Sequence, residues 1–205
     1  MEKKNYQKEL DAVIASVADG PRPRLLLQGC CGPCSSYVLE YLTRHFDVTL
    51  LFFNPNIRPE AEYDRRLAAL KKLLAAMPLA SPVTLIEPGW HGDAFMTAVR
   101  GLENEPEGGA RCPVCFGLRL RETARLAAEG GFDFFGTTLT VSPHKNAPLL
   151  NDIGEALSRE FGVTWLPSDF KKRNGYLRSI QLSRQYDIYR QEYCGCGLPE
   201  PTAQP

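Results

Sequence analysis

The chain has 205 residues, of which 43% are hydrophobic and 23% are charged, and this excludes a disordered polymer. Its 24 basic residues balance 24 acidic ones, so any site for a polyanion has to be a local patch. No apolar run reaches the ~18 residues of a membrane span, and the charged N-terminus lacks the apolar stretch of a signal peptide. We therefore expect a cytoplasmic protein without a membrane partner.

Strands and helices alternate along the chain. Short apolar runs predict strands at 24–28, 48–53, 83–86, 132–136 and 163–166. Helical spacing of apolar residues predicts helices at 35–44, 60–77, 93–100, 115–129, 151–161 and 176–189. Residues 104–110 read as a loop and the tail 198–205 as loosely held. No linker separates two domains, so the sequence predicts one domain, residues 1–205, with its core at about 20–197.

This alternation predicts an α/β fold with a parallel sheet and helices on both faces. In such sheets ligands bind beyond the carboxyl ends of the strands. Three segments rich in Gly, Pro, Asn and Cys follow predicted strands, at 29–36, 54–59 and 137–146. We expect them to converge on one site, although loops collect such residues in any case.

Cysteine is the most informative residue type. There are seven cysteines, an odd number, in a chain that is long for a disulfide-stapled secreted fold. They form three clusters, namely Cys30, Cys31 and Cys34, then Cys112 and Cys115, then Cys194 and Cys196. This grouping favours metal ligation or redox chemistry over use as small core residues.

The C-P-V-C pair at Cys112 and Cys115 opens a predicted helix, where the helix dipole favours thiolates. A second pair from the first loop would complete four thiolate ligands, which suit either zinc or an iron–sulfur cluster. The Cys194-Gly-Cys196 pair fits a strained, easily reduced disulfide or two further metal ligands, or else a tail with incidental cysteines.

Other candidate groups are weaker. Of the histidines, His45 and His91 fit helix-end and surface roles, whereas His144 follows the fourth strand on the expected ligand side. Neither phosphate-binding signature, G-x-x-x-x-G-K-[ST] nor G-x-G-x-x-G, is present, and cysteines occupy the place of a phosphate cradle.

A local basic patch interleaves with tyrosines near the C-terminus. Its candidate nucleic-acid-binding residues are Lys171, Lys172, Arg173 and Arg178. Arg184, Arg190, Tyr176, Tyr186, Tyr189 and Tyr193 lie nearby in sequence. Such patches hold an RNA backbone and stack an exposed base, but an ordinary solvated helix face has the same composition.

Five ordered segments resemble the QueH family of epoxyqueuosine reductases and span about residues 25–196. They are LLLQGCCGPCSS, FFNPNIRPEAEYDRR, RCPVCFGLRL, TTLTVSPHKN and YRQEYCGC. The resemblance implies a HUP-like fold, related to PP-loop ATPases. It also implies an oxidoreductase of queuosine biosynthesis. The implied substrate is tRNA with a GUN anticodon that carries epoxyqueuosine at the wobble position, and the epoxide oxygen leaves as water.

The resemblance also implies a cofactor and its ligands. Cys30, Cys31, Cys112 and Cys115 would hold a 4Fe-4S cluster, and Cys194 and Cys196 would be a redox-active pair. An additional mononuclear iron is also suggested, to which Cys34 and the tail cysteines could contribute. An electron donor protein is required, but the sequence does not identify it.

Epoxide opening to an alkene needs electrons and a proton source, and no nicotinamide or flavin motif is recognisable. An iron–sulfur centre could supply the electrons, and a Lewis-acidic iron could polarise the oxygen. Asp64, Glu62, Tyr63 and His144 are the candidate proton donors. Two alternatives stay open: a PP-loop-like tRNA sulfurtransferase or ligase, and a zinc-stapled RNA-binding domain.

Overall fold

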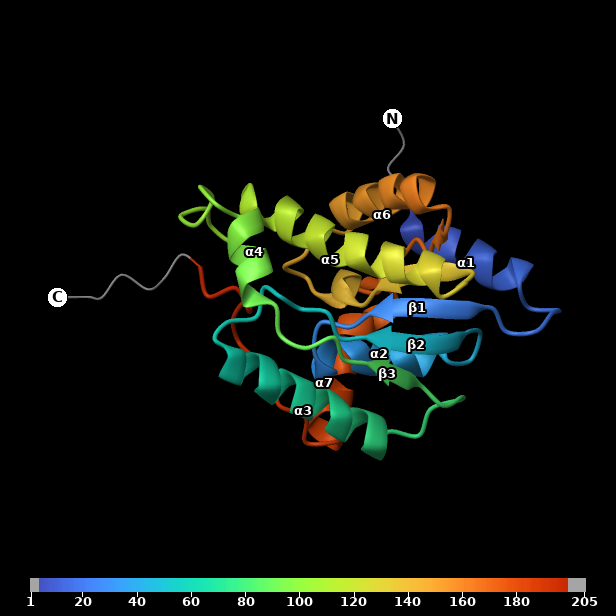
Figure 1. The fold of residues 1–205 in the computed structure, drawn as a ribbon. Helices are drawn as coiled ribbons and strands as arrows, with labels where there is room; N and C mark the ends of the chain where they lie inside the picture. Colours follow the sequence, from blue (N-terminus) through green and yellow to red (C-terminus); the bar gives the residue numbers. More distant parts are fainter. Residues whose placement is uncertain (1–3, 199–205) are drawn as a thin grey trace.

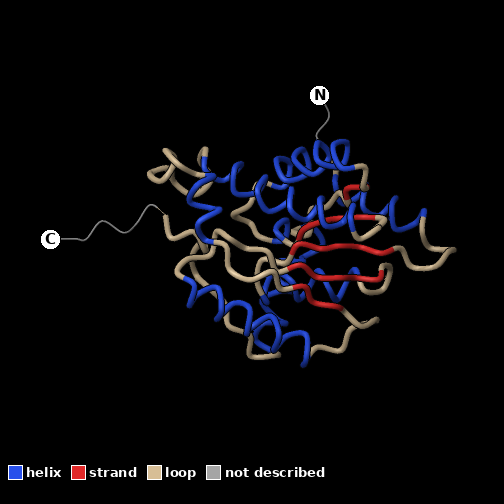
Figure 2. Tube along the Cα trace, viewed as in Figure 1, coloured by secondary structure: helices blue, strands red, loops and turns tan. Residues whose placement is uncertain are grey.

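A five-stranded sheet forms the centre of the protein, in a computed structural model that describes residues 4–198 (Figures 1 and 2). The strands are β1 (Arg24–Gln28), β2 (Asp47–Leu51), β3 (Thr84–Ile86), β4 (Phe134–Thr137) and β5 (Thr164–Trp165). Their order is β3-β2-β1-β4-β5, and every pairing is parallel. The α/β class and the parallel sheet are confirmed, and the topology is consistent with a HUP-like fold.

Seven α-helices accompany the sheet within the described residues. They are α1 (Tyr6–Ser16), α2 (Gly32–Leu42), α3 (Glu60–Ala76), α4 (Gly92–Ala98), α5 (Arg111–Glu129), α6 (Ala147–Phe161) and α7 (Gly175–Gln185). Two short 3-10 turns cover Leu139–Val141 and Lys172–Asn174. Helices α2, α3 and α7 lie on one side of the sheet, and α5 and α6 cover the other (Figure 1). Leu10 of α1 joins the core on the side of α2 and α3. Both faces are therefore covered, as a parallel sheet requires.

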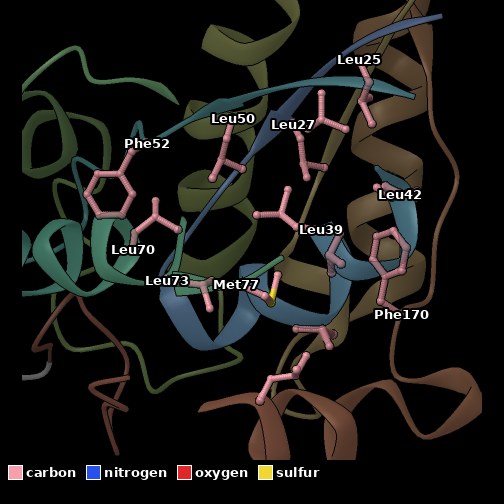
Figure 3. Close-up of a cluster of buried hydrophobic side chains, with 14 of the residues drawn as sticks. Leu25, Leu27, Leu39, Leu42, Leu50, Phe52, Leu70, Leu73, Met77 and Phe170 are labelled. Carbon is pink, nitrogen blue, oxygen red and sulfur yellow. The ribbon is translucent and has the colours of Figure 1, made fainter. Parts of the chain in front are cut away.

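Strand β1 explains why the sheet has two apolar faces. Leu25 and Leu27 point into the core beneath α2 and α3, whereas Leu26 points toward α5 and α6 (Figure 3 shows the first of these clusters). All three side chains are fully buried. Burial of a leucine side chain contributes about 1.5–3 kcal/mol, so these runs drive the sheet to the centre.

Helix α1 was not predicted from the sequence. Asn5 caps it by accepting a hydrogen bond from the Lys8 N–H at 3.2 Å, and Leu10 is fully buried in the core under α2. Only one apolar side chain of this helix is completely buried, which leaves a weak periodic signal in the sequence. Residues 199–205 of the predicted loose tail lie outside the described residues.

The carboxyl ends of all five strands lie at one edge of the sheet. At this edge β1 stands between β2 and β4, with Gln28 opposite Leu51 on one side and Thr137 on the other. The chain winds outward in opposite directions from this position, which is where open α/β sheets hold their ligands. Among the helices of residues 4–198, none combines the length and apolar content that crossing a bilayer requires.

Candidate functional site

A cavity of about 350 Å³ opens at this edge of the sheet. Six cysteines line it, from segments far apart in the sequence: Cys30, Cys34, Cys112, Cys115, Cys194 and Cys196. The seventh, Cys31, lies beside Cys30, with 3.7 Å between the two Sγ atoms. All seven are free thiols. The three cysteine clusters therefore meet at one place, beyond the carboxyl ends of the strands.

The first cluster is built into the turn between β1 and α2. Cys31 is the N-cap of α2 in extended conformation, the helix begins at Gly32, and Pro33 lies in its first turn. Gly32 allows α2 to approach α3, because a Cβ there would lie 2.7 Å from Ile188 Cγ2 and 3.2 Å from Ala69 O. The Sγ atoms of Cys30, Cys31 and Cys34 all lie within 4.8 Å of one another, so this group could bind a metal ion.

The three thiols of this turn differ in acidity. Hydrogen bonds from Cys31 and Cys34 hold the pKa of Cys30 well below its usual value, and the charge of Arg119 acts in the same direction. Cys31 and Cys34 each donate a hydrogen bond to Cys30, and burial acts on both in the same direction. These effects raise the pKa of Cys31 to about 12 and raise the pKa of Cys34 well above its usual value.

The second cluster occupies the first turns of α5. Cys112 accepts a hydrogen bond from the Gly108 N–H at 3.1 Å, and Cys115 packs with Phe95 of α4 and Cys196. Burial raises the pKa of Cys115 to about 11. The helix N-terminus favours negative charge here, so a thiolate would be stabilised once a cation compensates for its burial.

The third cluster is held by contacts outside regular secondary structure. The Gly195 carbonyl accepts a hydrogen bond from the Arg58 N–H at 2.8 Å, and the Sγ atoms of Cys194 and Cys196 lie 3.8 Å apart. Lys145 Nζ lies 3.7 Å from Cys194 Sγ. The hydrogen bond from Cys196 and the positive charge of Lys145 lower the pKa of Cys194 to about 5.

Arg111 joins the second and third clusters. This side chain is 1% exposed and is among the largest fully buried groups of the protein. Its Nη2 donates to the Leu198 carbonyl at 2.6 Å and approaches Cys196 Sγ at 3.6 Å. Its Nη1 donates to the carbonyls of Leu102, Glu103 and Glu105. Arg111 therefore fixes both the loop before α5 and the end of the described chain.

Two further buried arginines line the cavity. Arg66 pairs with Glu62 at 2.7 Å, and Arg119 donates to Asn54 Oδ1 at 2.6 Å. Sequence reasoning missed both, together with Lys145. A signal was available for Arg119, because it follows Cys115 by four residues and so lies on the same helix face.

The candidate proton donors are placed differently from one another. His144 is exposed but lies in the cavity lining, next to Lys145. Asp64 is exposed on α3 and is not among the lining residues. Glu62 and Tyr63 are buried, and Glu62 is engaged by Arg66 and by the Tyr189 hydroxyl.

The basic patch is divided by the fold. Arg173 and Arg178 form ion pairs with Asp11 and Glu40, and Lys171 pairs with Asp169. Lys172 is exposed. None of these four basic residues belongs to the cavity lining, whereas three residues near them in sequence do: Tyr176, Arg190 and Tyr193. Of these, Tyr193 is 50% exposed, although it is a large aromatic side chain.

The donor set fits a metal–thiolate centre. Thiolates prefer zinc, copper(I) and iron–sulfur clusters over hard cations. Several thiolates gathered in a partly enclosed cavity would repel one another, and the nearby Arg66, Arg119 and Lys145 are cationic. These observations agree with a bound metal centre but do not by themselves distinguish one metal from another.

Comparison with known proteins identifies the family. The profile of the family described as epoxyqueuosine reductase QueH matches residues 25–200. A Streptococcus pyogenes protein named epoxyqueuosine reductase QueH is 45% identical over 94% of this chain and 78% of its own length. A protein of the same name from Staphylococcus epidermidis is 44% identical over 95% of this chain and 84% of its own length. Another from Dehalococcoides mccartyi is 37% identical over 87% of this chain and 93% of its own length. The chain therefore belongs to the QueH family.

Proposed function

We propose that this protein is an epoxyqueuosine reductase, an oxidoreductase that converts epoxyqueuosine in tRNA to queuosine. The observation that carries the proposal is the convergence of six cysteines from three distant segments on one cavity, in a chain of this family. We also propose a tRNA substrate with a GUN anticodon, which the resemblance of the sequence motifs implies.

The reaction sets the requirements for the site. Conversion of an epoxide to an alkene breaks both C–O bonds, consumes two electrons and two protons, and releases the oxygen as water. We assign Cys30, Cys31, Cys112 and Cys115 as ligands of a 4Fe-4S cluster, with Cys34 available to an additional mononuclear iron. When bound, such a centre would supply electrons and a Lewis acid.

The Cys194 and Cys196 pair is suited to redox chemistry of its own. Two thiols that form a disulfide release two electrons and two protons, which matches the demand of the reaction. Lys145 supports the thiolate form of Cys194. Burial of the ammonium lowers the pKa of Lys145, but attraction by Cys194 and Glu107 outweighs this and raises the pKa, so the side chain stays positively charged beside Cys194. A separate electron donor protein would then restore the thiols.

His144 is the best placed of the four proton donors expected from the sequence, because Glu62, Tyr63 and Asp64 do not belong to the cavity lining. It lines the cavity and is open to solvent, so it can take up a proton after each turnover. Asp64 lies outside the lining, and a role for it would require a contact made only with bound tRNA.

We assign tRNA contact to Lys171, Lys172, Arg173 and Arg178. If they hold the phosphate backbone, Lys171→Ala combined with Arg173→Ala should weaken tRNA binding and flatten its dependence on salt. Equal affinity of the double variant and the wild type at every salt concentration would remove this segment from the interface.

Turnover of epoxyqueuosine-containing tRNA under anaerobic conditions tests the function directly. The wild-type protein with a chemical reductant should form queuosine, and Cys112→Ala should not. Gly117→Ala is a matched control on the same helix, because a Cβ at this position meets nothing within 4 Å. Full activity of Cys112→Ala would exclude Cys112 from the reaction, and no product from the wild type would contradict the proposed function.

Neither alternative is favoured. A sulfurtransferase or ligase of the PP-loop kind would need a phosphate cradle, where this chain has Gly-Cys-Cys-Gly-Pro-Cys. A zinc-stapled RNA-binding domain would leave the Cys194 and Cys196 pair without a role. Hydrolysis of ATP stimulated by tRNA would support the first, and tightly held zinc in a colourless protein would support the second.

A further inference from the structure

Unpaired polar atoms gather in the wall of the cavity. Within the described part of the chain, Asn56 Oδ1, Arg66 Nη2, Arg119 Nε and Gln191 Oε1 are buried and have no hydrogen-bond partner. All four residues line the cavity. Asn56, Arg66 and Arg119 are only 5%, 4% and 3% exposed. Such atoms are rare in folded proteins, because a buried polar atom that nothing bonds to destabilises the fold.

Three of the four side chains are held in place by their other polar atoms. Glu62 fixes Arg66 through Nε at 2.7 Å, and the Tyr193 ring centre lies 5.3 Å from its guanidinium carbon. Asn54 fixes Arg119 through Nη2 at 2.6 Å. Gln191 is fixed through Nε2, which donates to Cys31 Sγ at 3.1 Å. The unpaired atoms of these three side chains are therefore held in fixed positions, which lowers the entropic cost of binding a ligand.

The atom types define the ligand. Arg66 Nη2 and Arg119 Nε can only donate, whereas Asn56 Oδ1 and Gln191 Oε1 can only accept. An epoxide oxygen accepts but cannot donate, so it can satisfy the arginines and not the amides. A complete partner therefore carries O–H or N–H groups close to its epoxide oxygen.

We propose that Asn56, Arg66, Arg119 and Gln191 form a hydrogen-bonding subsite for the epoxide-bearing part of the modified base. This inference rests on the proposed function. The arginines orient oxygen acceptors of the substrate, and the amides accept from its hydroxyl or amine groups. The subsite makes the protein prefer tRNA that carries the modification over the same tRNA with guanine at that position.

A competing explanation is that the arginines only offset the negative charge of the thiolates. Asn56 separates the two explanations, because it is neutral and has no role in charge balance. Because Oδ1 of Asn56 is buried and unpaired, replacing Asn56 by an apolar side chain of similar shape removes an unfavourable buried oxygen and breaks no hydrogen bond at that atom. Asn56→Leu should therefore leave the melting temperature equal or higher while it weakens recognition.

The measurement is the Kd of anaerobically purified protein for two forms of one tRNA, with epoxyqueuosine or with guanine at the wobble position. Asn56→Leu should raise the Kd of the modified form about 3- to 10-fold and leave that of the guanine form unchanged. Ser35→Ala is the matched control. Ser35 Oγ is also buried and, among the residues described, unpaired, but it lies outside the cavity lining. This control should retain the preference.

Arg66→Lys provides a second variant that keeps the charge opposite Glu62 but loses the guanidinium fork. It should also lose preference for the modified form, by about tenfold, with unchanged iron content. The inference would be overturned if wild type, Asn56→Leu and Arg66→Lys all preferred the modified tRNA over the guanine form by the same factor. It would also be overturned if Arg66→Lys lost iron while its Kd for the modified tRNA stayed the same. If the wild type turns over the modified tRNA in either case, the proposed function stands independently.

Discussion

The first and third cysteine clusters meet in one cavity but are supported in different ways. Cys30, Cys31 and Cys34 belong to a strand–helix turn whose backbone is fixed by β1 and α2. Cys194 and Cys196 follow the last helix, and their segment is held by hydrogen bonds from the Arg58 N–H to the Gly195 carbonyl and from Arg111 to the Leu198 carbonyl, with Lys145 and Arg111 close to the two Sγ atoms. The sheet thus provides a rigid half of the site, and a few hydrogen bonds tether the other half to it.

This difference agrees with the different tasks that we propose for the two halves. A rigid turn suits thiols that hold a metal centre in constant geometry. A tethered segment can shift by small amounts, which suits thiols that approach and separate during a redox cycle. Changes in the turn should therefore act mainly on stability, and changes in the tethered segment mainly on turnover.

The largest expected effect comes from Arg111 of α5, which lies outside the strand–helix turn and outside residues 194–196, and which is bonded to the loop before α5 as well as to Leu198. Arg111→Ala removes the guanidinium that donates to the partly buried carbonyl groups of Leu102, Glu103, Glu105 and Leu198, of which Leu102 keeps a second donor in the Glu105 N–H. It should lower the free energy of unfolding by about 3–5 kcal/mol. Urea unfolding of the reduced protein measures this. Labelling with a thiol reagent should then show that the substitution accelerates the reaction of Cys194 and Cys196 more than that of Cys31. Equal acceleration at all three cysteines would contradict the claim that the first and third clusters are supported separately.

Gly32→Ala tests the rigid turn. The new Cβ would lie 3.2 Å from the Ala69 carbonyl oxygen, which belongs to backbone, and should push α2 away from α3 at a cost of about 1–3 kcal/mol. Thermal unfolding checks this loss. Gly117→Ala should instead stabilise the protein by about 0.5–1 kcal/mol, because it adds no contact and removes backbone freedom.

Gly195→Ala tests the tether with a smaller effect on stability. A Cβ at this position would lie 2.9 Å from both Arg66 Nη1 and Ile57 Cγ1, so the segment must move. We expect the free energy of unfolding to change by less than about 1 kcal/mol while turnover falls about tenfold or more. If Gly195→Ala kept normal turnover but lost much of its stability, the proposal that the segment around Cys194 and Cys196 serves turnover rather than stability would be contradicted.

The smallest effect is expected at the surface, away from both clusters. Arg178→Ala removes a partly exposed ion pair with Glu40 and should change the free energy of unfolding by about 0.2–1 kcal/mol. Its effect on the melting temperature should shrink with added salt. A loss as large as that of Arg111→Ala would show that this pair supports the fold.

Much of the fold could be predicted from the sequence, because its elements have clear signals. The predicted strand 24–28 matches β1, and the predicted helix 60–77 differs from α3 by one residue. Three predicted helix starts were late, at α2, α5 and α6, because Gly, Cys and Pro in their first turns read as loop. Pro33 and Pro148 instead occupy the first turns of α2 and α6, where a missing N–H costs nothing.

The site was only partly predictable. Cysteine spacing and the order of strands indicated which thiols would meet, since both are properties of the sequence. The unpaired atoms of Asn56 and Arg66 could not be found this way. Being unpaired depends on every neighbour in three dimensions, and no local pattern distinguishes these side chains from ordinary polar residues in a loop and a helix.

Iron and acid-labile sulfide analysis of anaerobically purified protein, with its visible spectrum, tests the central claim most directly. The claim is that the converging thiols hold an iron–sulfur centre for epoxide reduction. The account predicts about four or more iron atoms per chain with a matching amount of sulfide in a coloured protein. Zinc without sulfide in a colourless protein would contradict it and would support a structural metal instead.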